Sequence, residues 1–250
     1  MKEQLYQYIL SLGDNSMILG HRLSELCGHG PSLETDIALT NISLDLFGQV
    51  RNYFQYAAEL KGEEVSEDQI AFLRYPHEYS NTLLVEQPNK DFSYVIARQF
   101  LFDAFHKPFL EGLCESNDET LAAIAKKSLK ESQYHLRFSS EWTKRLGAGT
   151  EESHERMQNA INYLWPYLGE LFTVGELEQE MASYGIAPDM DAVKASCMQT
   201  IGETFAEANI QTPDSKWTQS GGKKGVHTEH LGFILADLQY MQRTYPNMDW

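Results

Sequence analysis

Cysteine, positive charge and long apolar runs are scarce in this sequence. Three cysteines occur among 250 residues, none in a CxxC arrangement, which argues against a disulfide framework and a thiolate zinc site. Lys and Arg total 20 against 36 Asp and Glu, a formal net charge of −16 that disfavours nucleic acids and membrane surfaces as partners. No window approaches the ~20 apolar residues that span a bilayer. The first residues also lack the pattern of a signal peptide, so a soluble, cytoplasmic protein is expected.

Helical periodicity, by contrast, runs through nearly the whole chain. Apolar residues recur at steps of three and four, while strand-like alternation is scarce. Helices are predicted over 2–27, 33–61, 66–73, 91–115, 118–147, 151–172, 175–184, 189–209 and 228–244. Asp91 and Asp118 have the position of helix N-caps, and Ser66 with Gln69 has capping-box spacing. An all-α fold is predicted, with a core bundle over about 2–147 and a helical part over about 151–250, together one domain spanning 1–250.

The inner face of each long helix can be predicted from the same spacing. In the fourth long helix the inner stripe includes Glu131 and His135, and in the third it includes Asp103 and His106. The predicted inner residues of the second helix are Ala38, Asn41, Asp45, Gly48 and Asn52, and those of the first are Tyr8, Leu12, Asn15, Leu19 and Leu23. Each of the four helices is therefore expected to place at least one polar side chain at the same level of the core.

That polar layer resembles the ferritin-like di-iron carboxylate bundle, in which two helices give one Glu each and two give Glu-x-x-His. The ligand set is incomplete. Asn15 stands where the first helix should supply Glu, Gly48 stands where His is expected, and Glu131 and His135 are four residues apart rather than three. Only Asp103 suits a bridging carboxylate.

Two interpretations of the layer follow: a metal site with altered ligands, or a buried network of hydrogen bonds and ion pairs. The missing ligands favour the network. The prediction is a ferritin-like four-helix bundle with additional C-terminal helices and a degenerate di-iron site, with no metal or cofactor bound by this chain and no catalytic residue.

Several strings carry a more specific resemblance. They are "LGDNSMILGHRLSELCGHGPSLETDIAL", "SNTLLVEQPN", "IARQFLFDAFH", "QYHLRFS" and above all "SGGKKGVHTEHLG". Together they resemble the structural-subunit family of the bacterial phenylacetyl-CoA 1,2-epoxidase, the multicomponent oxygenase of aerobic phenylacetate breakdown. The similarity extends from Leu12 to Trp250.

The resemblance implies a structural role. In such a complex the di-iron centre and the oxygen chemistry belong to a homologous catalytic subunit, while a reductase component delivers electrons. The structural subunit pairs with this catalytic partner, supports its fold and contributes to binding of phenylacetyl-CoA.

Two segments are implied as acyl-CoA contacts: Glu78, Tyr79, Ser80 and Asn81 in the long linker 74–91, and Gln179, Glu180 and Met181 in "LEQEM". A ring, a hydroxyl and an amide in a loop can stack on and hydrogen-bond a nucleotide-like group. The alternatives are a loop that satisfies its own backbone and, for the second segment, a solvated helix face.

The "SGGKKGVHTEHLG" string offers two more candidates. Lys223 and Lys224 follow paired glycines and could meet a CoA phosphate or acidic groups of the catalytic partner, although a solvated surface is the alternative. His227, Glu229 and His230 do not reproduce a zinc-binding motif, and Thr228 as a helix cap explains part of the string more simply.

Two other functions stay open. One is an autonomous di-iron carboxylate oxidase or monooxygenase that uses Asp45, Asp103, Glu131 and His135. The other is a helical scaffold or storage protein that has nothing to do with CoA esters.

Overall fold

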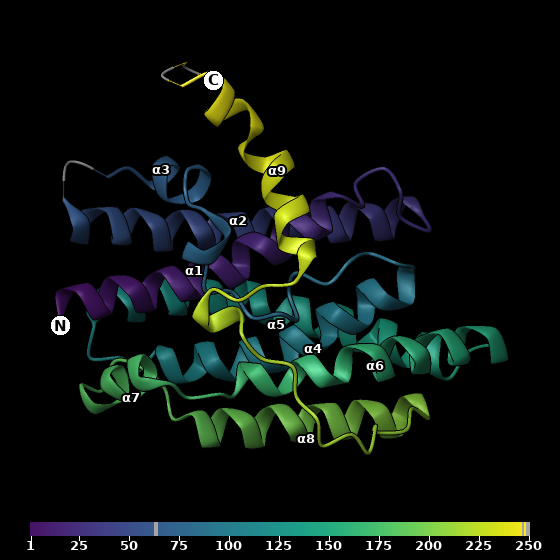
Figure 1. Ribbon diagram of the computed structural model, residues 1–250. Helices are drawn as coiled ribbons and strands as arrows, with labels where there is room; N and C mark the ends of the chain where they lie inside the picture. The colour runs from purple at the N-terminus through teal and green to yellow at the C-terminus, as the bar shows by residue number, and fades with distance from the viewer. Residues whose placement is uncertain (63–64, 247, 249–250) are drawn as a thin grey trace. The chain divides into compact units, whose positions relative to one another are not determined.

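The computed structural model describes residues 1–62, 65–246 and 248, and within them the chain is helical with no β-strand (Figure 1). The helices are α1 (Lys2–Ser24), α2 (Leu33–Lys61), α3 (Glu67–Phe72), η1 (Pro76–Glu78), α4 (Phe92–Leu113), α5 (Glu119–Gly147), α6 (Glu151–Leu171), α7 (Glu176–Ser183), α8 (Met190–Ala208), η2 (Gly222–Lys224) and α9 (Glu229–Thr244). The all-α class is confirmed, and four long helices followed by shorter ones give the predicted order of a ferritin-like bundle.

Three helices begin at the capping residues that the sequence predicted. Asp91 and Asp118 accept hydrogen bonds from the backbone N–H groups of Tyr94 and Leu121, which confirms both as N-caps. Ser66 and Gln69 form the predicted capping box. The first helix ends at Ser24 rather than at residue 27, because the next residues tighten into i→i−3 hydrogen bonds before the left-handed Gly28.

The chain divides into two compact units. The terminal unit comprises Met1–Gly28, Glu34–Pro88 and Gly221–Trp250, and the middle unit comprises His29–Leu33 and Asn89–Ser220. The single domain predicted over 1–250 stays a prediction. Its expected internal division, near residue 147, differs from these units because the segment after residue 220 packs with the first helices. Residues 247, 249 and 250 of that predicted C-terminal part lie outside the described residues.

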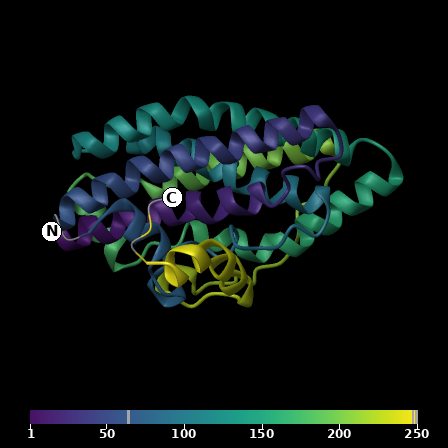
Figure 2. The same ribbon diagram turned by 90° about the horizontal axis from the view of Figure 1, so that it is seen from above.

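In the terminal unit α1 and α2 form an antiparallel hairpin (Figures 1 and 2). Lys61 Nζ pairs with Glu3 Oε2 at 2.7 Å near one end, and Ser43 Oγ donates to the carbonyl of Gly20 at 2.7 Å further along. A Cβ on Gly13 would lie 2.4 Å from the Phe54 ring, so glycine is what allows the two helices to approach closely there.

The predicted inner face of α2 is wrong. Asn41 and Gly48 are exposed and Asp45 is half-buried, whereas the buried face carries Leu39, Ile42, Leu46, Val50 and Phe54. The helix has apolar residues on its outer side as well, including Ile37 and Leu44, so apolar spacing alone did not identify the face that packs.

In the middle unit α4 lies among α5, α6 and α8 (Figures 1 and 2). It is buried along most of its length and on all sides, as expected for a helix with little polar surface. Edge-on ring contacts fix its first turns: Phe92 meets Trp142 of α5 at 5.1 Å, and Tyr94 meets Tyr163 of α6 at 5.5 Å between ring centroids. The helix at the centre of this unit is thus the one that carries Asp103 and His106.

In the described part of the chain, no helix combines the length and apolar content needed to cross a bilayer. The cytoplasmic location stays a prediction.

Candidate functional site

The long linker after α3 is largely buried in the terminal unit and is anchored by α1. The backbone N–H of Ser80 donates to Asp14 Oδ2 at 2.9 Å, and both the N–H and the hydroxyl of Thr82 donate to Asn15 Oδ1 at 2.9 Å. Asn15, where a di-iron bundle would carry Glu, is therefore a linker anchor. An amide suits this position because its oxygen accepts two hydrogen bonds without placing a charge in the core.

Asp14 and Arg74 form a buried ion pair beneath this linker. The Asp14 side chain is fully buried, and its two carboxylate oxygens accept from Nη1 and Nη2 of Arg74. The guanidinium also lies 4.1 Å from the centroid of the Tyr79 ring. Burial by itself lowers the pKa of Arg74, but the Asp14 carboxylate more than offsets this, and the net pKa is raised.

A second buried carboxylate, Glu86, holds the C-terminal segment. Its Oε1 accepts from the backbone N–H of Thr228 at 2.7 Å, and its Oε2 lies 3.1 Å from both Asn81 Nδ2 and His227 Nδ1. The other ring nitrogen of His227 lies 3.0 Å from the carbonyl oxygen of Tyr79. Both imidazole nitrogens thus face oxygen acceptors, which only the doubly protonated, charged ring can satisfy.

The charge on His227 makes this contact pH-dependent. Burial lowers the pKa of His227, but hydrogen bonds to Glu86 and to the Tyr79 carbonyl outweigh it, so the pKa is raised above 6.5. Such a group stabilises the fold fully below pH 6.5, and its contribution is lost as the pH rises through the folded-state pKa. Denaturant unfolding of wild type and His227→Gln from pH 6 to pH 9 should show the wild-type advantage shrinking by on the order of 1 kcal/mol. A constant difference would contradict a charged His227.

The glycines of the "SGGKKG" string permit close approach, as the sequence suggested, but to the chain's own backbone. A Cβ on Gly222 would lie 2.2 Å from the carbonyl oxygen of Asn81. Gly225 has φ +73°, and a Cβ there would lie 2.3 Å from the carbonyl oxygen of His77. Between them Lys223 is half-buried and Lys224 is exposed. The phosphate or partner contact predicted for the two lysines stays a prediction.

The first predicted acyl-CoA segment is only partly at the surface. Glu78 is exposed and Ser80 is half-buried. Tyr79 and Asn81 are fully buried: the Tyr79 hydroxyl donates to the carbonyl of Ala71 at 2.9 Å, and the Asn81 amide donates to Glu86. Burial raises the pKa of Tyr79 to about 12, so its hydroxyl stays neutral. The ligand role of this segment stays a prediction.

The second predicted segment lies on α7 of the middle unit. Gln179 is exposed, Glu180 is half-buried and Met181 is fully buried. Met181 is held by local structure, since its carbonyl accepts from the backbone N–H groups of Ile186 and Ala187. Only the first two side chains could reach a ligand without rearrangement, and their predicted contact stays a prediction.

A polar layer lies between α4 and α5, as predicted. The α5 residues that face it are not all the predicted ones. Asp103 and His135 are fully buried, and Asp103 Oδ1 and Oδ2 accept from Gln99 Nε2 and Ser139 Oγ, each at 2.7 Å. Glu131, expected to point inward, is only half-buried. The buried face of α5 instead follows a stripe of small polar residues, because their size lets α4 pack closely: Ser128, Ser132, Ser139 and Thr143.

Ionisation in this layer is suppressed by burial. Burial raises the pKa of Asp103 to about 7 despite the opposing effects of His135, Ser139 and Gln99. Burial and the nearby His135 lower the pKa of His106 to about 3, so its ring is neutral at physiological pH. The two hydrogen bonds to Asp103 and the neutral ring of His106 agree with a buried polar network.

The residues do not fit a di-iron centre. Among the described residues, no group of three or more His, Cys, Asp or Glu side chains is arranged to hold a metal ion. Asp103 has both oxygens committed to neutral donors within its own unit. In the terminal unit Gly48 is exposed and provides no ligand. A site with two irons needs several carboxylates together with imidazole, and the described residues bring no such set together.

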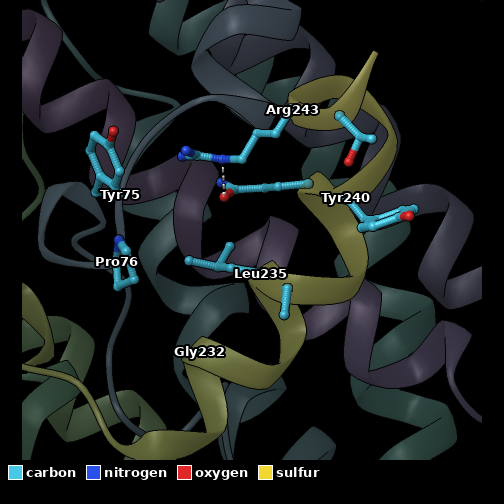
Figure 3. Close-up of a pocket in the computed structure, with 9 residues that line it drawn as sticks. Tyr75, Pro76, Gly232, Leu235, Tyr240 and Arg243 are labelled. Atoms are coloured by element: carbon cyan, nitrogen blue, oxygen red, sulfur yellow. Dashed lines mark hydrogen bonds between the residues drawn. The ribbon is translucent and has the colours of Figure 1, made fainter. Parts of the chain in front are cut away.

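A surface groove lies elsewhere in the terminal unit. It has a volume of about 310 Å³ and lies between α9 and the start of the linker (Figure 3). Its lining residues are Tyr75, Pro76, Gly232, Leu235, Ala236, Gln239, Tyr240, Arg243 and Thr244. Figure 3 shows Leu235 and the Arg243 guanidinium pointing toward Tyr75 and Pro76 across the groove.

Comparison with known sequences decides which family these features belong to. The profile of the family described as phenylacetic acid catabolic protein matches residues 1–250. The chain belongs to this family. A curated relative, the C subunit of the 1,2-phenylacetyl-CoA epoxidase of Escherichia coli (strain K12), is 49% identical over 247 residues, which is 99% of each chain. The resemblance inferred from the sequence strings is confirmed.

In this member of the phenylacetic acid catabolic protein family, sequence reasoning missed the charged residues that organise the terminal unit. Asp14, Arg74 and Glu86 are at most one-tenth exposed, yet none was singled out. A signal was present: Asp14 interrupts an apolar stretch of the first helix, where a charge has to be paired. Its partner is 60 residues away along the chain, so no local pattern could name Arg74.

Proposed function

We propose that this chain is a structural, non-catalytic subunit of a phenylacetyl-CoA 1,2-epoxidase complex in phenylacetate catabolism. The observation that carries the proposal is the full-length match to the curated epoxidase relative, with 99% of both chains covered. The donor set of the α4–α5 layer supports it from chemistry, because both Asp103 oxygens already accept hydrogen bonds from Gln99 and Ser139, and no group of three or more His, Cys, Asp or Glu side chains among the described residues is arranged to hold a metal ion.

The partners follow from the same assignment. The chain pairs with a di-iron catalytic subunit, which holds the iron, while a reductase component supplies electrons through the complex. The substrate is phenylacetyl-CoA. This chain supports the fold of its partner and forms part of the acyl-CoA site.

In each of the two predicted segments, taken separately, the side chains with exposed surface are the candidate contacts, and the buried ones hold the local backbone. Glu78 and Ser80 of the linker, with Gln179 and Glu180 of α7, are available to a ligand. Tyr79, Asn81 and Met181 are buried and hold the backbone that presents them. Lys223 and Lys224 are the candidate contacts for a CoA phosphate, and the acidic Glu78 and Glu180 must face away from it.

Iron content tests the proposal directly. The chain purified alone is expected to hold far less than one iron, and the chain co-expressed with its catalytic subunit is expected to form a pair with about two. About two irons in the isolated chain would instead support an autonomous di-iron oxidase using Asp45, Asp103, Glu131 and His135.

The same purified pair tests the acyl-CoA contact. Phenylacetyl-CoA binding should weaken in Ser80→Ala and Gln179→Ala variants of this chain, because each removes a polar group that the ligand can reach. Gln133→Ala on the exposed side of α5 is a suitable control. Unchanged binding in both variants would remove these residues from the ligand site.

A further inference from the structure

The outward side of α9 is unusually apolar for an exposed helix. Phe233 is 65% exposed, Tyr240 is 60% exposed and Met241 is 41% exposed. Phe233 lies about two turns before the consecutive residues Tyr240 and Met241 on α9. Tyr75, 57% exposed, lies across the groove from α9 (Figure 3). Soluble proteins rarely expose large apolar side chains in such a group unless another molecule covers them.

The α9 groove borders part of this patch, since Tyr75 and Tyr240 line it whereas Phe233 and Met241 do not. Gly232 and Ala236 are one turn apart on α9 and leave little side-chain bulk beside Pro76. Leu235 forms an apolar wall. A volume of about 310 Å³ is at the lower end of the range for small-molecule pockets, which suits one bulky side chain better than an acyl-CoA.

One positive charge is fixed at the rim of the groove. Arg243 Nε donates to Gln239 Oε1 at 2.9 Å, and Nη2 donates to the carbonyls of Leu73 and Arg74 at 2.9 and 3.0 Å. Its guanidinium also lies 4.8 Å from the Tyr75 ring centroid. Within the described residues these acceptors are neutral, so the guanidinium is held in place without a countercharge. A carboxylate from another molecule would complement it.

The charge of the chain helps to identify the occupant. A second copy would bring together two molecules of formal net charge −16, which disfavours self-association. A CoA thioester carries several phosphate charges, whereas Arg243 is the one cationic residue among those that line the groove. A protein segment with one bulky apolar residue near one carboxylate fits both the volume and the charge.

We propose that the α9 groove is a docking site for the catalytic subunit, which inserts a bulky apolar side chain between α9 and Pro76 and places a carboxylate on Arg243. The inference rests on the proposed function, because it assumes that such a partner exists. It adds which surface of the terminal unit the partner covers and what chemistry the partner presents.

A charge placed in the groove tests the proposal. Ala236→Glu fills the groove and repels a carboxylate, yet Ala236 is exposed and Glu is a good helix former, so the variant should fold. Its Kd for the purified catalytic subunit is expected to rise by about tenfold or more. Arg243→Ala should also raise the Kd and make it less dependent on salt concentration. Ala123→Glu, the same change at an exposed position of α5, should bind as wild type does.

The outcomes separate the docking site from the proposed function. If Ala236→Glu folds and binds the catalytic subunit with the wild-type Kd, the docking site is overturned and the proposed function stands. If the wild-type chain does not bind that subunit, both are overturned. If light scattering shows that the wild-type chain forms dimers by itself and Ala236→Glu abolishes them, the occupant is a second copy and the assignment to the catalytic partner is wrong.

Discussion

Replacing Asp14 by alanine is expected to lower the free energy of unfolding by about 3–5 kcal/mol, the largest effect of any single substitution considered for this protein. The change leaves the buried Arg74 guanidinium without its countercharge and removes the acceptor of the Ser80 N–H. Asp14→Asn should be nearly as damaging, because its amide offers N–H groups where Arg74 needs an acceptor. Urea denaturation of the isolated chain measures both.

The control for Asp14 is an exposed pair on the same helix. Glu3 pairs with Lys61 at 2.7 Å, but its side chain is 59% exposed. Surface pairs of this kind contribute about 0–1 kcal/mol, so Glu3→Ala should change stability little. If Asp14→Ala cost no more than Glu3→Ala, the buried pair would not be important for stability, contrary to the interpretation given above.

Gly222→Ala is expected to cost about 3 kcal/mol, at the upper end of the range for overpacked sites. The added Cβ would lie 2.2 Å from the carbonyl oxygen of Asn81 and 3.1 Å from the nitrogen of Leu83. Both are backbone atoms of a buried linker, so no flexible side chain can move aside. The C-terminal segment should therefore detach more readily, which faster proteolysis after residue 220 and a lower denaturation midpoint would report.

Gly48→Ala is the matched control. Gly48 is exposed on α2, and a Cβ there would meet nothing within 4 Å. Because alanine is the better helix former, this substitution should leave stability unchanged or raise it by up to about 1 kcal/mol. Equal effects of the two substitutions would mean that the contact between Gly222 and the linker is not needed for stability.

The predictions for Asp14 and Gly222 both concern the contacts that hold the linker in place. The linker is held from one side by Asp14 and Asn15 of α1 and from the other by the segment from Gly222 to His227. The proposed acyl-CoA residues Glu78 and Ser80 lie on this linker, so its stability and its ability to present a ligand contact are linked. Within "SGGKKGVHTEHLG", Gly222, Gly225, His227 and the backbone N–H of Thr228 all lie against the linker.

The elements of the fold were predictable from the sequence because their causes are local. Asp91 and Asp118 start helices by accepting hydrogen bonds from N–H groups three residues ahead, and Ser66 and Gln69 cap each other within one turn. The stripe of α4 through Asp103 and His106 was also correct, since that helix is apolar on all sides and any register buries it.

The details of the site were less predictable, because they depend on partners distant in sequence. Apolar residues on two sides of α2 made its inner face ambiguous, and Asp45 and Gly48 were placed inward in error. In α5 the sequence favoured the large Glu131, whereas close packing against α4 buries the small residues Ser132 and Ser139.

The sequence by itself determined the all-α class, the order of the helices with several of their capping residues, and the family. These depend on spacing and residue type, which a single chain displays directly. Only the tertiary structure decided that Asp14 pairs with Arg74, that Glu86 binds His227 and that Gly222 approaches Asn81. The reason is physical: a buried charge must find a partner somewhere in the folded chain, but which of the distant candidates it meets is set by how the helices and linkers pack.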